Sequence, residues 1–347
     1  MQQTFEFFKV DPATWKNTSQ INTIISCSIN NDLNNDLIST ASIECEEELG
    51  ECYVRVYLKC VQDGVTYSFP FGTYLAQSPE TTFDGRYQKI SVDAYSPLIE
   101  LKDSKPPFGY AALSGDNIMD LAGQLVSEHV RCPVVKVTGC ETTLNSNFVS
   151  DFENDTYYSF VHDIIANANY HFSLDELGRI LFAPDQKVSA LRPVWTFNDG
   201  NSSILYPDIS RSRDLYGIPN VVEVLCSYGS GYKFYRAENH ESNSPVSIEN
   251  RGREIIHRVN NPPTLVSPSD AEIKHYAEKL LESLTKEEST ITYKHGYCGT
   301  SIGRAVRLNY ERAGIKNVIA MVVSQTIECK PGCMVTEKAV YTTKMWG

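Results

Sequence analysis

The sequence predicts a mainly β protein that carries a helix-containing α+β insert between two β regions. Alternating strands joined by tight turns dominate residues 1–104 and residues 189–347. Between these regions, an amphipathic helix runs directly into a short hairpin over residues 156–185. Because the strands of the β regions follow one another without crossover helices, we expect each region to form an antiparallel barrel or sandwich.

The first β domain is expected to span residues 1–104. In Cys52–Cys60 every second residue is apolar, which is typical of a strand with one buried face. The apolar positions are Val54, Val56, Leu58 and Cys60, and Tyr53, Arg55, Tyr57 and Lys59 alternate with them. The turn residues at 62–64 predict a hairpin with Val65–Tyr74 as the returning strand. Lys89–Tyr95 is expected to add a further strand.

Residues 105–188 are expected to form the α+β insert domain. Ser114 is predicted to cap its first helix and Thr156 its second. Each helix has one apolar stripe at helical spacing. The stripes are Ile118, Leu121, Ala122, Leu125 and Val126 in the first helix, and Tyr157, Phe160, Val161, Ile164 and Ala168 in the second. The hairpin that follows is expected to turn at residues 175–178.

Residues 189–347 are predicted to form a second β-barrel domain, interrupted by one helix over residues 269–287. Ser269 and Glu272 have the spacing of a capping box at the start of that helix. Its buried face is expected to contain Ile273, Tyr276, Ala277, Leu280, Leu281 and Leu284. The Gly229-Ser230-Gly231 turn predicts a hairpin before it. Part of residues 189–225 could instead return to the first barrel, and the two β regions show no sequence repetition.

The composition favours a soluble protein with a substantial core. The chain has 347 residues, of which 41% are hydrophobic and 21% charged, so global disorder is not expected. Its N-terminus lacks the pattern of a secretory signal, and no apolar run is long enough for a membrane span. We therefore expect synthesis in a cytoplasm and no membrane partner. The net charge of −12, without a Lys/Arg block, disfavours sequence-specific nucleic-acid binding.

Ten cysteines raise the question of metals and disulfides. The sequence has no Cys-x-x-Cys pair, and Cys329 and Cys333 flank a Pro-Gly turn with no second pair nearby. Without a secretory signal, reduced cysteines that pack as small hydrophobes are expected. A zinc site and disulfides are the two alternatives.

The sequence predicts no catalytic, cofactor-binding or metal-binding residues, and therefore no enzyme. His162 and Asp163 are adjacent in a helix, where they point about 100° apart and should not form a base–orienter pair. The acidic run Glu44–Glu51 resembles a carboxylate pair for glycoside cleavage, but a solvated loop is the better interpretation. The acids of residues 151–155 lack the pattern of a calcium loop, so stabilisation of the following helix N-terminus is expected.

In the order and spacing of its motifs, the chain resembles the baseplate hub family of phage tails. That family includes the late-control D proteins and the N-terminal half of the type VI secretion spike protein. The resemblance covers nearly the whole chain. Its first motifs are Phe69-Pro70-Phe71-Gly72-Thr73-Tyr74-Leu75 and Ile90–Tyr95 leading to Leu98–Leu101. Its later motifs are Leu177-Gly178-Arg179-Ile180-Leu181-Phe182, Asn220-Val221-Val222-Glu223-Val224 and Asn243-Ser244-Pro245-Val246-Ser247.

The resemblance implies two tube-type antiparallel β-barrels plus small helix-containing accessory domains, assembled as a homotrimer in the virion. Three copies would present six barrels to a sixfold tail tube or distal tail protein and threefold symmetry to a spike or central fibre protein. The ring would enclose the tape measure protein and the channel for DNA passage, and would contact other baseplate proteins. The family implies no cofactor.

One departure from the family and two alternatives complete the sequence-based expectations. Many relatives continue into a spike, a peptidase or a lysozyme-like domain, whereas this chain ends at Trp346-Gly347, so the needle or hydrolase is expected to be a separate protein. The first alternative is a carbohydrate-binding tail or cell-surface module, because 20 tyrosines could supply stacking surfaces. The second is a hydrolase that uses two carboxylates.

Overall fold

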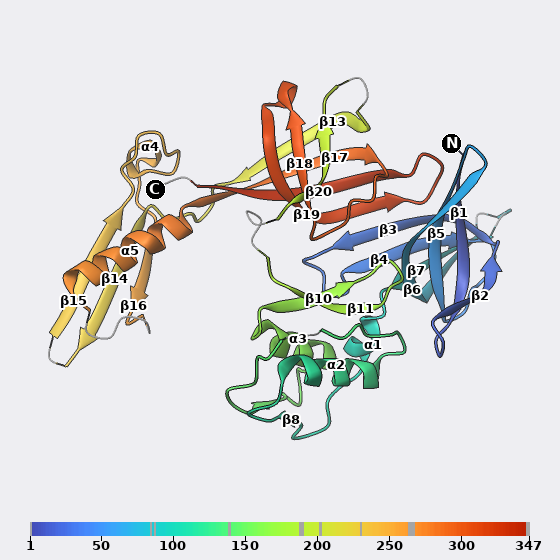
Figure 1. Ribbon diagram of the computed structural model, residues 1–347, viewed down its shortest axis with the longest axis horizontal. Helices are drawn as coiled ribbons and strands as arrows, with labels where there is room; N and C mark the ends of the chain where they lie inside the picture. The colour runs from blue at the N-terminus through green and yellow to red at the C-terminus, as the bar shows by residue number, and fades with distance from the viewer. Residues whose placement is uncertain are drawn as a thin grey trace.

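The computed structural model describes residues 2–83, 85–86, 88–137, 140–186, 191–200, 203–229, 231–262 and 268–344. Ser230, Trp346, Gly347 and the predicted boundary at residues 188 and 189 lie outside this set. Strands of two curled β modules dominate the structure, and two smaller helix-containing units flank them (Figure 1). The predicted fold class, mainly β with an α+β insert, is confirmed. The boundaries of the predicted domains stay a prediction.

The first β module contains seven strands in the order β2-β1-β5-β6-β7-β4-β3. The strands are β1 (Gln2–Asp11), β2 (Lys16–Ile21), β3 (Ile24–Asp32), β4 (Ser39–Cys45), β5 (Cys52–Gln62), β6 (Val65–Phe83) and β7 (Gln88–Tyr95). Side chains from all seven strands share one buried core, so the sheet curls around it. The predicted inward positions Val54, Val56 and Leu58 are fully buried there.

The second β module contains six strands around a core of its own. They are β12 (Pro193–Asn198), β13 (Leu205–Asp214), β17 (Lys286–Gly296), β18 (Ala305–Tyr310), β19 (Ile315–Glu328) and β20 (Met334–Lys344), with the 3-10 turn η2 (Glu311–Ala313) after β18. Their order is β12-β18-β19-β20-β17-β13. The pairing of β12 with β18 and of β13 with β17 places both strands in this module.

Five strands of each module follow the same path. The order β3-β4-β7-β6-β5 matches β13-β17-β20-β19-β18, and every pair along both paths is antiparallel. Inward-facing partners also correspond: Val54–Tyr74, Ala76–Ala94 and Ile43–Val92 match Val306–Ala320, Val322–Ala339 and Tyr293–Glu337. The outer strand differs, because β1 lies antiparallel to β5 whereas β12 lies parallel to β18. The modules are therefore alike in topology although their sequences show no repeat.

The two modules are joined edge to edge. The second half of β19, Ser324–Glu328, continues beyond the end of β18 and pairs with Ser28–Asp32 of β3. This pairing makes one continuous sheet of 13 strands, seen in Figure 1 where β19 meets β3. Ile327 and Cys329 are thereby buried in the core of the first module.

The insert packs against the first module and forms a separate core. It consists of α1 (Ile99–Asp103), β8 (Ala111–Ala112), α2 (Ile118–His129), β9 (Phe148–Val149), α3 (Tyr157–Ala166), β10 (Tyr170–Leu174) and β11 (Ile180–Pro184). Thr156 caps α3 as predicted. The prediction for α2 was wrong by one turn, because Asn117 and not Ser114 accepts from the first amides. The helix α3 ends before Ala168, which still packs against the core.

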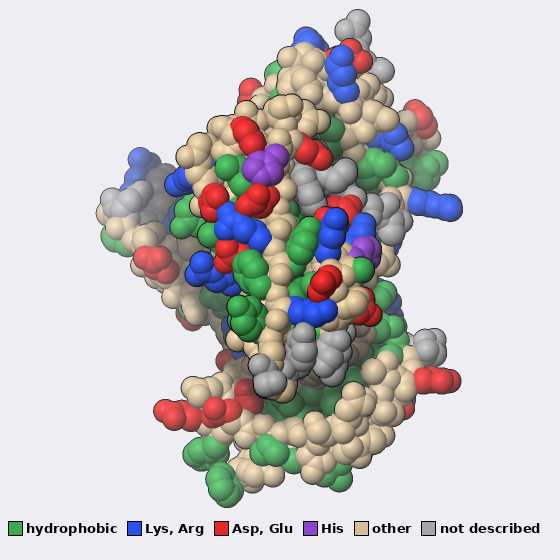
Figure 2. Space-filling view, turned by 90° about the vertical axis from the view of Figure 1, so that its left-hand side faces the viewer, with side chains coloured by type: hydrophobic (Ala, Val, Ile, Leu, Met, Phe, Trp, Pro, Cys, Tyr) green, Lys and Arg blue, Asp and Glu red, His purple; other side chains and the backbone are tan. Residues whose placement is uncertain are grey.

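A second small unit lies at the far end of the molecule from the first β module (Figure 1). A three-stranded sheet of β14 (Val221–Tyr228), β15 (Gly231–Glu238) and β16 (Ile256–Asn260) is covered by α5 (Asp270–Leu284), and α4 (Ile248–Arg251) lies nearby. The predicted capping box of Ser269 and Glu272 is confirmed, but α5 ends three residues earlier than predicted. Figure 2 views the molecule from this side, where acidic and basic side chains are interspersed.

Among the described residues, no helix is long and apolar enough to cross a membrane.

Candidate functional site: the junction of the β modules

The tip of the β10–β11 hairpin docks onto β6 through the backbone carbonyls of Glu176 and Leu177. The oxygen of Leu177 accepts from Thr73 Oγ1 at 2.8 Å and from Trp15 Nε1 at 3.1 Å. Arg55 donates its Nε to Thr73 Oγ1 at 2.7 Å and lies under the ring of Trp15. Arg55 is 4% exposed, although the alternation of β5 places it on the face opposite the module core. The insert therefore covers this second face and supplies part of its hydrogen bonding.

This contact brings two motifs of the sequence resemblance together. The motif 69–75 lies on β6, and the motif 177–182 forms the turn and the start of β11. The amide of Gly72 donates to the carbonyl of Glu176 at 2.9 Å. Residues about 100 positions apart in the sequence thus fix the insert onto the first module.

Gly178 is required at this contact for two reasons. Its φ is +73°, a conformation that glycine adopts without strain. A Cβ there would also lie 2.9 Å from the backbone nitrogen of Thr73, closer than real Cβ contacts. We expect Gly178→Ala to lower the free energy of unfolding by more than about 1 kcal/mol, because the hairpin must shift off β6.

Urea unfolding followed by tryptophan fluorescence measures the effect of Gly178→Ala. Gly217→Ala is the matched control, since Gly217 has φ +70° and no atom within 4 Å of an added Cβ. The control carries the conformational cost alone. Equal losses for the two variants would show that the contact with Thr73 is unimportant.

A cavity of about 600 Å³ lies where the first module, the hairpin and the second module meet. Phe71 and Tyr297 face each other on its wall with ring centroids 4.8 Å apart. Buried polar side chains line its base, among them Ser39 and Gln325. The cavity marks the point where the shared sheet divides: the first half of β19 pairs with β18 and the second half with β3.

Beneath this cavity, Glu337 is fully buried and fully satisfied. Its Oε2 accepts from Tyr293 at 2.5 Å, and its Oε1 accepts from Thr300 at 2.6 Å and from Gln325 at 2.7 Å. His295 Nε2 lies 3.3 Å from Oε2, outside good hydrogen-bond geometry, and has no other polar partner. We read this contact as an ion pair within a hydrogen-bonded cluster.

The electrostatics of the pair favour both charges. Burial by itself raises the pKa of Glu337, but His295, Thr300 and Tyr293 outweigh it and hold that pKa below its ordinary value. Burial by itself lowers the pKa of His295, and the neighbouring Cys298 and Glu337 raise it to about 10. His295 is therefore protonated and Glu337 ionised at neutral pH.

The cluster continues across the module junction as a chain of side-chain hydrogen bonds. Asn31 of β3 donates to Gln325 Oε1 at 3.2 Å, and Ser39 donates to Asn31 Oδ1 at 2.5 Å. Ser39 Oγ also lies 3.0 Å from the hydroxyl of Tyr74. Polar groups of the second module are thus linked to the core of the first, so the chain favours one relative orientation of the modules.

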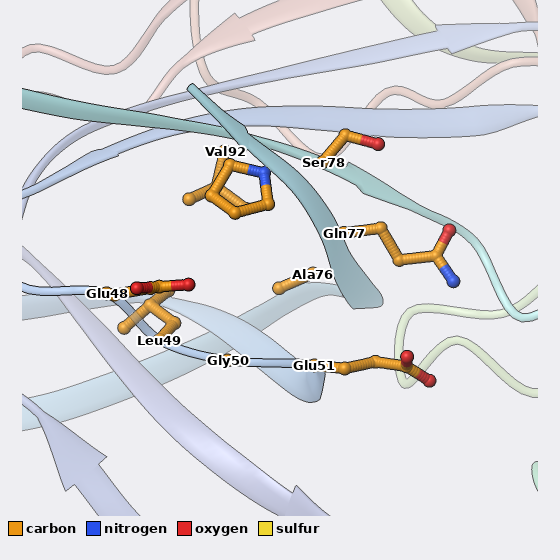
Figure 3. Close-up of a pocket in the computed structure, with 9 residues that line it drawn as sticks. Glu48, Leu49, Gly50, Glu51, Ala76, Gln77, Ser78 and Val92 are labelled. Atoms are coloured by element: carbon orange, nitrogen blue, oxygen red, sulfur yellow. The ribbon is translucent and has the colours of Figure 1, made fainter. Parts of the chain in front are cut away.

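The acidic run considered as a glycosidase pair lies mostly on a loop. Glu44 is on β4, where the contacts of its carboxylate with Lys89 and Ser26 lower its pKa. Glu48 and Glu51 line a pocket of about 360 Å³ beside β6. Figure 3 shows this loop facing Ala76, Gln77 and Ser78 across the pocket.

The other acidic and histidine candidates make local contacts on the surface. The carboxylate of Asp151 accepts from the amides of Glu153 and Asn154, which closes a turn before α3. His162 Nδ1 lies 3.3 Å from Asp163 Oδ1, and the expectation that the two do not act as a base–orienter pair stays a prediction. Both side chains of that pair are exposed.

All ten cysteines are free thiols in the structure. Cys27 and Cys329 lie opposite each other at the β3–β19 junction, where the amide of Cys329 donates to the carbonyl of Cys27 at 3.0 Å. Over the ranges that the structure describes, no group of three or more His, Cys, Asp or Glu residues could hold a metal ion.

Comparison with solved structures shows what the chain resembles in fold. It is similar to a tail protein from Neisseria meningitidis MC58, with a TM-score of 0.64 and 13% identity over 100% of this chain and 98% of that one. It is also similar to the 43 kDa tail protein of prophage MuSo2 from Shewanella oneidensis, with a TM-score of 0.64 and 10% identity over 98% and 97% of the two chains.

A third similar structure is a chain of the Francisella PdpA-VgrG complex, with a TM-score of 0.60 and 10% identity over 98% of this chain and 52% of that one. No family model and no curated protein matches the sequence. At these identities the likeness establishes the fold: the chain has the architecture of phage tail proteins over its full length. The resemblance inferred from the sequence motifs is confirmed at this level.

Proposed function

We propose that this chain is a structural protein of a phage tail, a trimeric baseplate hub located at the tail tip of the virion. The observation that carries the proposal is the pair of topologically alike β modules joined within one chain. Three copies would supply six modules in a ring, so that a threefold assembly can meet a sixfold tube. The likeness in fold to tail proteins from two bacterial sources supports the same role.

The proposed ring has two different faces. One mates with the tail tube or distal tail protein, and the other presents threefold symmetry to a spike or central fibre protein. Its lumen holds the tape measure protein before DNA passes. The net charge of −12 suits a channel wall to which DNA does not adhere. The insert and the outer α+β unit are available for contacts with other baseplate proteins.

The proposal is tested by the mass of the purified protein and by its partners. Light scattering is expected to give three times the chain mass of 39.0 kDa, and the oligomer is expected to retain tail-tube protein in a pull-down. A monomer that binds glycans on an array would favour the carbohydrate-binding alternative. A monomer that neither retains tail-tube protein nor binds glycans would contradict the hub proposal as well.

A further inference from the structure

We call the pairing of β19 with β3, which joins the two modules, the internal junction. Each module also has one strand edge that corresponds to a side of this junction but has no strand paired to it in the part of the chain that the structure describes. In the internal junction, Ser324–Glu328 of β19 projects past the end of β18 and is covered by β3. In the first module, β6 corresponds to β19 and β5 to β18. The pairing of β5 with β6 ends at Ala76, so Gln77–Phe83 projects past it in the same way and pairs only with β7.

The second module likewise has an open receiving edge. Its strand β13 corresponds to β3, pairs with β17 on one side, and forms the edge of the 13-stranded sheet on the other. The core behind that edge is incompletely covered, since Leu205 and Ile209 are only partly buried against it. The residue of the first module that matches Ile209 is Cys27, which is buried at the β3–β19 junction.

We propose that Ser78–Phe83 of one copy pairs with Ile209–Asp214 of β13 in a second copy of this chain. The corresponding inward-facing pairs of the two modules align their strands residue by residue. In this alignment Pro79 of β6 corresponds to Gln325 of β19, and Ile209 of β13 corresponds to Cys27 of β3. The register of β3 on β19 then puts Thr82 opposite Ser210 and Phe83 opposite Ile209. This proposal rests on the trimeric ring proposed above and names the strands that close it.

The exposure of one side chain at the open edge supports this occupant. Phe83 is 70% exposed although its counterpart Cys329 is buried, so the second copy would remove a large apolar side chain from water.

Pro79 limits the pairing without preventing it. Proline has no backbone N–H to donate to a strand partner. The backbone hydrogen bond that the amide of Gln325 can donate in the internal junction is therefore lost at Pro79. Thr81 and Phe83, at the next two positions of the same parity, keep their amides. Unpaired strand edges of this kind accept a strand from another chain.

The first experiment compares two exposed phenylalanines in the full chain. Phe83→Ser is expected to raise the dissociation constant of the trimer by about tenfold or more, since it removes one buried aromatic side chain per contact. Phe108→Ser is the matched control, because Phe108 is 85% exposed on the insert. Neither change should alter the melting temperature of the monomer. A trimer that is equally stable in both variants would overturn the proposed interface and leave the hub proposal standing.

The second experiment tests the register by cross-linking. Thr82 and Ser210 would form a directly opposite pair without mutual hydrogen bonds, at a spacing that suits a disulfide. Co-expression of Thr82→Cys chains with Ser210→Cys chains should give covalent dimers under mild oxidation, whereas each variant alone should not. Trimers without this cross-link contradict the register only. A protein that stays monomeric at every concentration contradicts the interface and the trimeric hub together.

Discussion

Replacing Glu337 with alanine is expected to lower the free energy of unfolding by about 3–5 kcal/mol, the usual cost of breaking a buried ion pair from one side. The change would leave His295 without its counter-charge in a site where neither side chain is exposed. It would also remove the acceptor of Tyr293, Thr300 and Gln325. Each donor left unpaired in the interior adds to the loss.

Urea unfolding at neutral pH measures this loss. Glu47→Ala is the control, because Glu47 is an exposed acid on a loop and its removal should change stability by less than about 0.5 kcal/mol. Glu337→Gln should fall between the two, since the amide keeps the size and one acceptor oxygen but not the charge. A Glu337→Ala variant as stable as the control would show that the buried cluster does not hold the modules together.

The stabilisation by the His295–Glu337 pair is expected to depend on pH in a defined direction. Because the pKa of His295 is raised from 6.5 to about 10, its contribution is complete below about pH 6.5 and is lost as the pH rises through 10. Because the pKa of Glu337 is lowered from 4.5, its contribution is complete above about pH 4.5 and is lost on acidification. The difference in unfolding free energy between the natural protein and Glu337→Gln should therefore be largest between those limits. A difference that grows from pH 7 to 10 would contradict the assigned charges.

Replacing Phe160 with alanine is expected to lower the free energy of unfolding by about 3–5 kcal/mol, the range for removing a buried aromatic ring. Phe160 is fully buried on the inner face of α3. Its ring contacts Tyr110 and Phe148, with centroid distances of 5.4 and 5.1 Å. The surrounding side chains, among them Tyr157 and Phe172, already belong to a close-packed core and cannot readily close the cavity.

Thermal unfolding with Phe152→Ala as the control tests this core assignment. Phe152 belongs to the same insert but is 69% exposed, so its loss should be small. Leu280, predicted from its helical spacing to be as buried as its neighbours, is only half-buried on α5. Its replacement should therefore cost less than that of Leu281. Equal melting temperatures for Phe160→Ala and Phe152→Ala would contradict the packing described here.

The local elements of the fold could be predicted because their signals are short in range. The capping oxygens of Thr156 and Ser269 act on amides within three residues, and both predictions are confirmed. Asn117 was missed as a cap because Ser114 offers the same chemistry three residues earlier. The pairing of β3 with β19 links residues almost 300 positions apart, and no local pattern specifies it.

The buried cluster of the junction was not predicted from the sequence, although one signal points to it. In β20 the inward positions are Val335, Glu337 and Ala339, so an acid interrupts an otherwise apolar alternation. An inward acid requires partners, but His295 and Gln325 come from other strands and cannot be assigned without the register. The docking of Leu177 onto β6 could not be predicted either. Every residue has a backbone carbonyl, so the residue type does not indicate which carbonyl accepts a tertiary hydrogen bond.

The central claim is that one chain supplies two alike β modules, so that a threefold oligomer presents a nearly sixfold ring. End-on electron microscopy of the purified oligomer tests it most directly. We expect a closed ring of six similar β densities around a lumen, with strict threefold symmetry from the inserts and outer units. A ring with only three β densities, or an oligomer with no lumen, would contradict the claim.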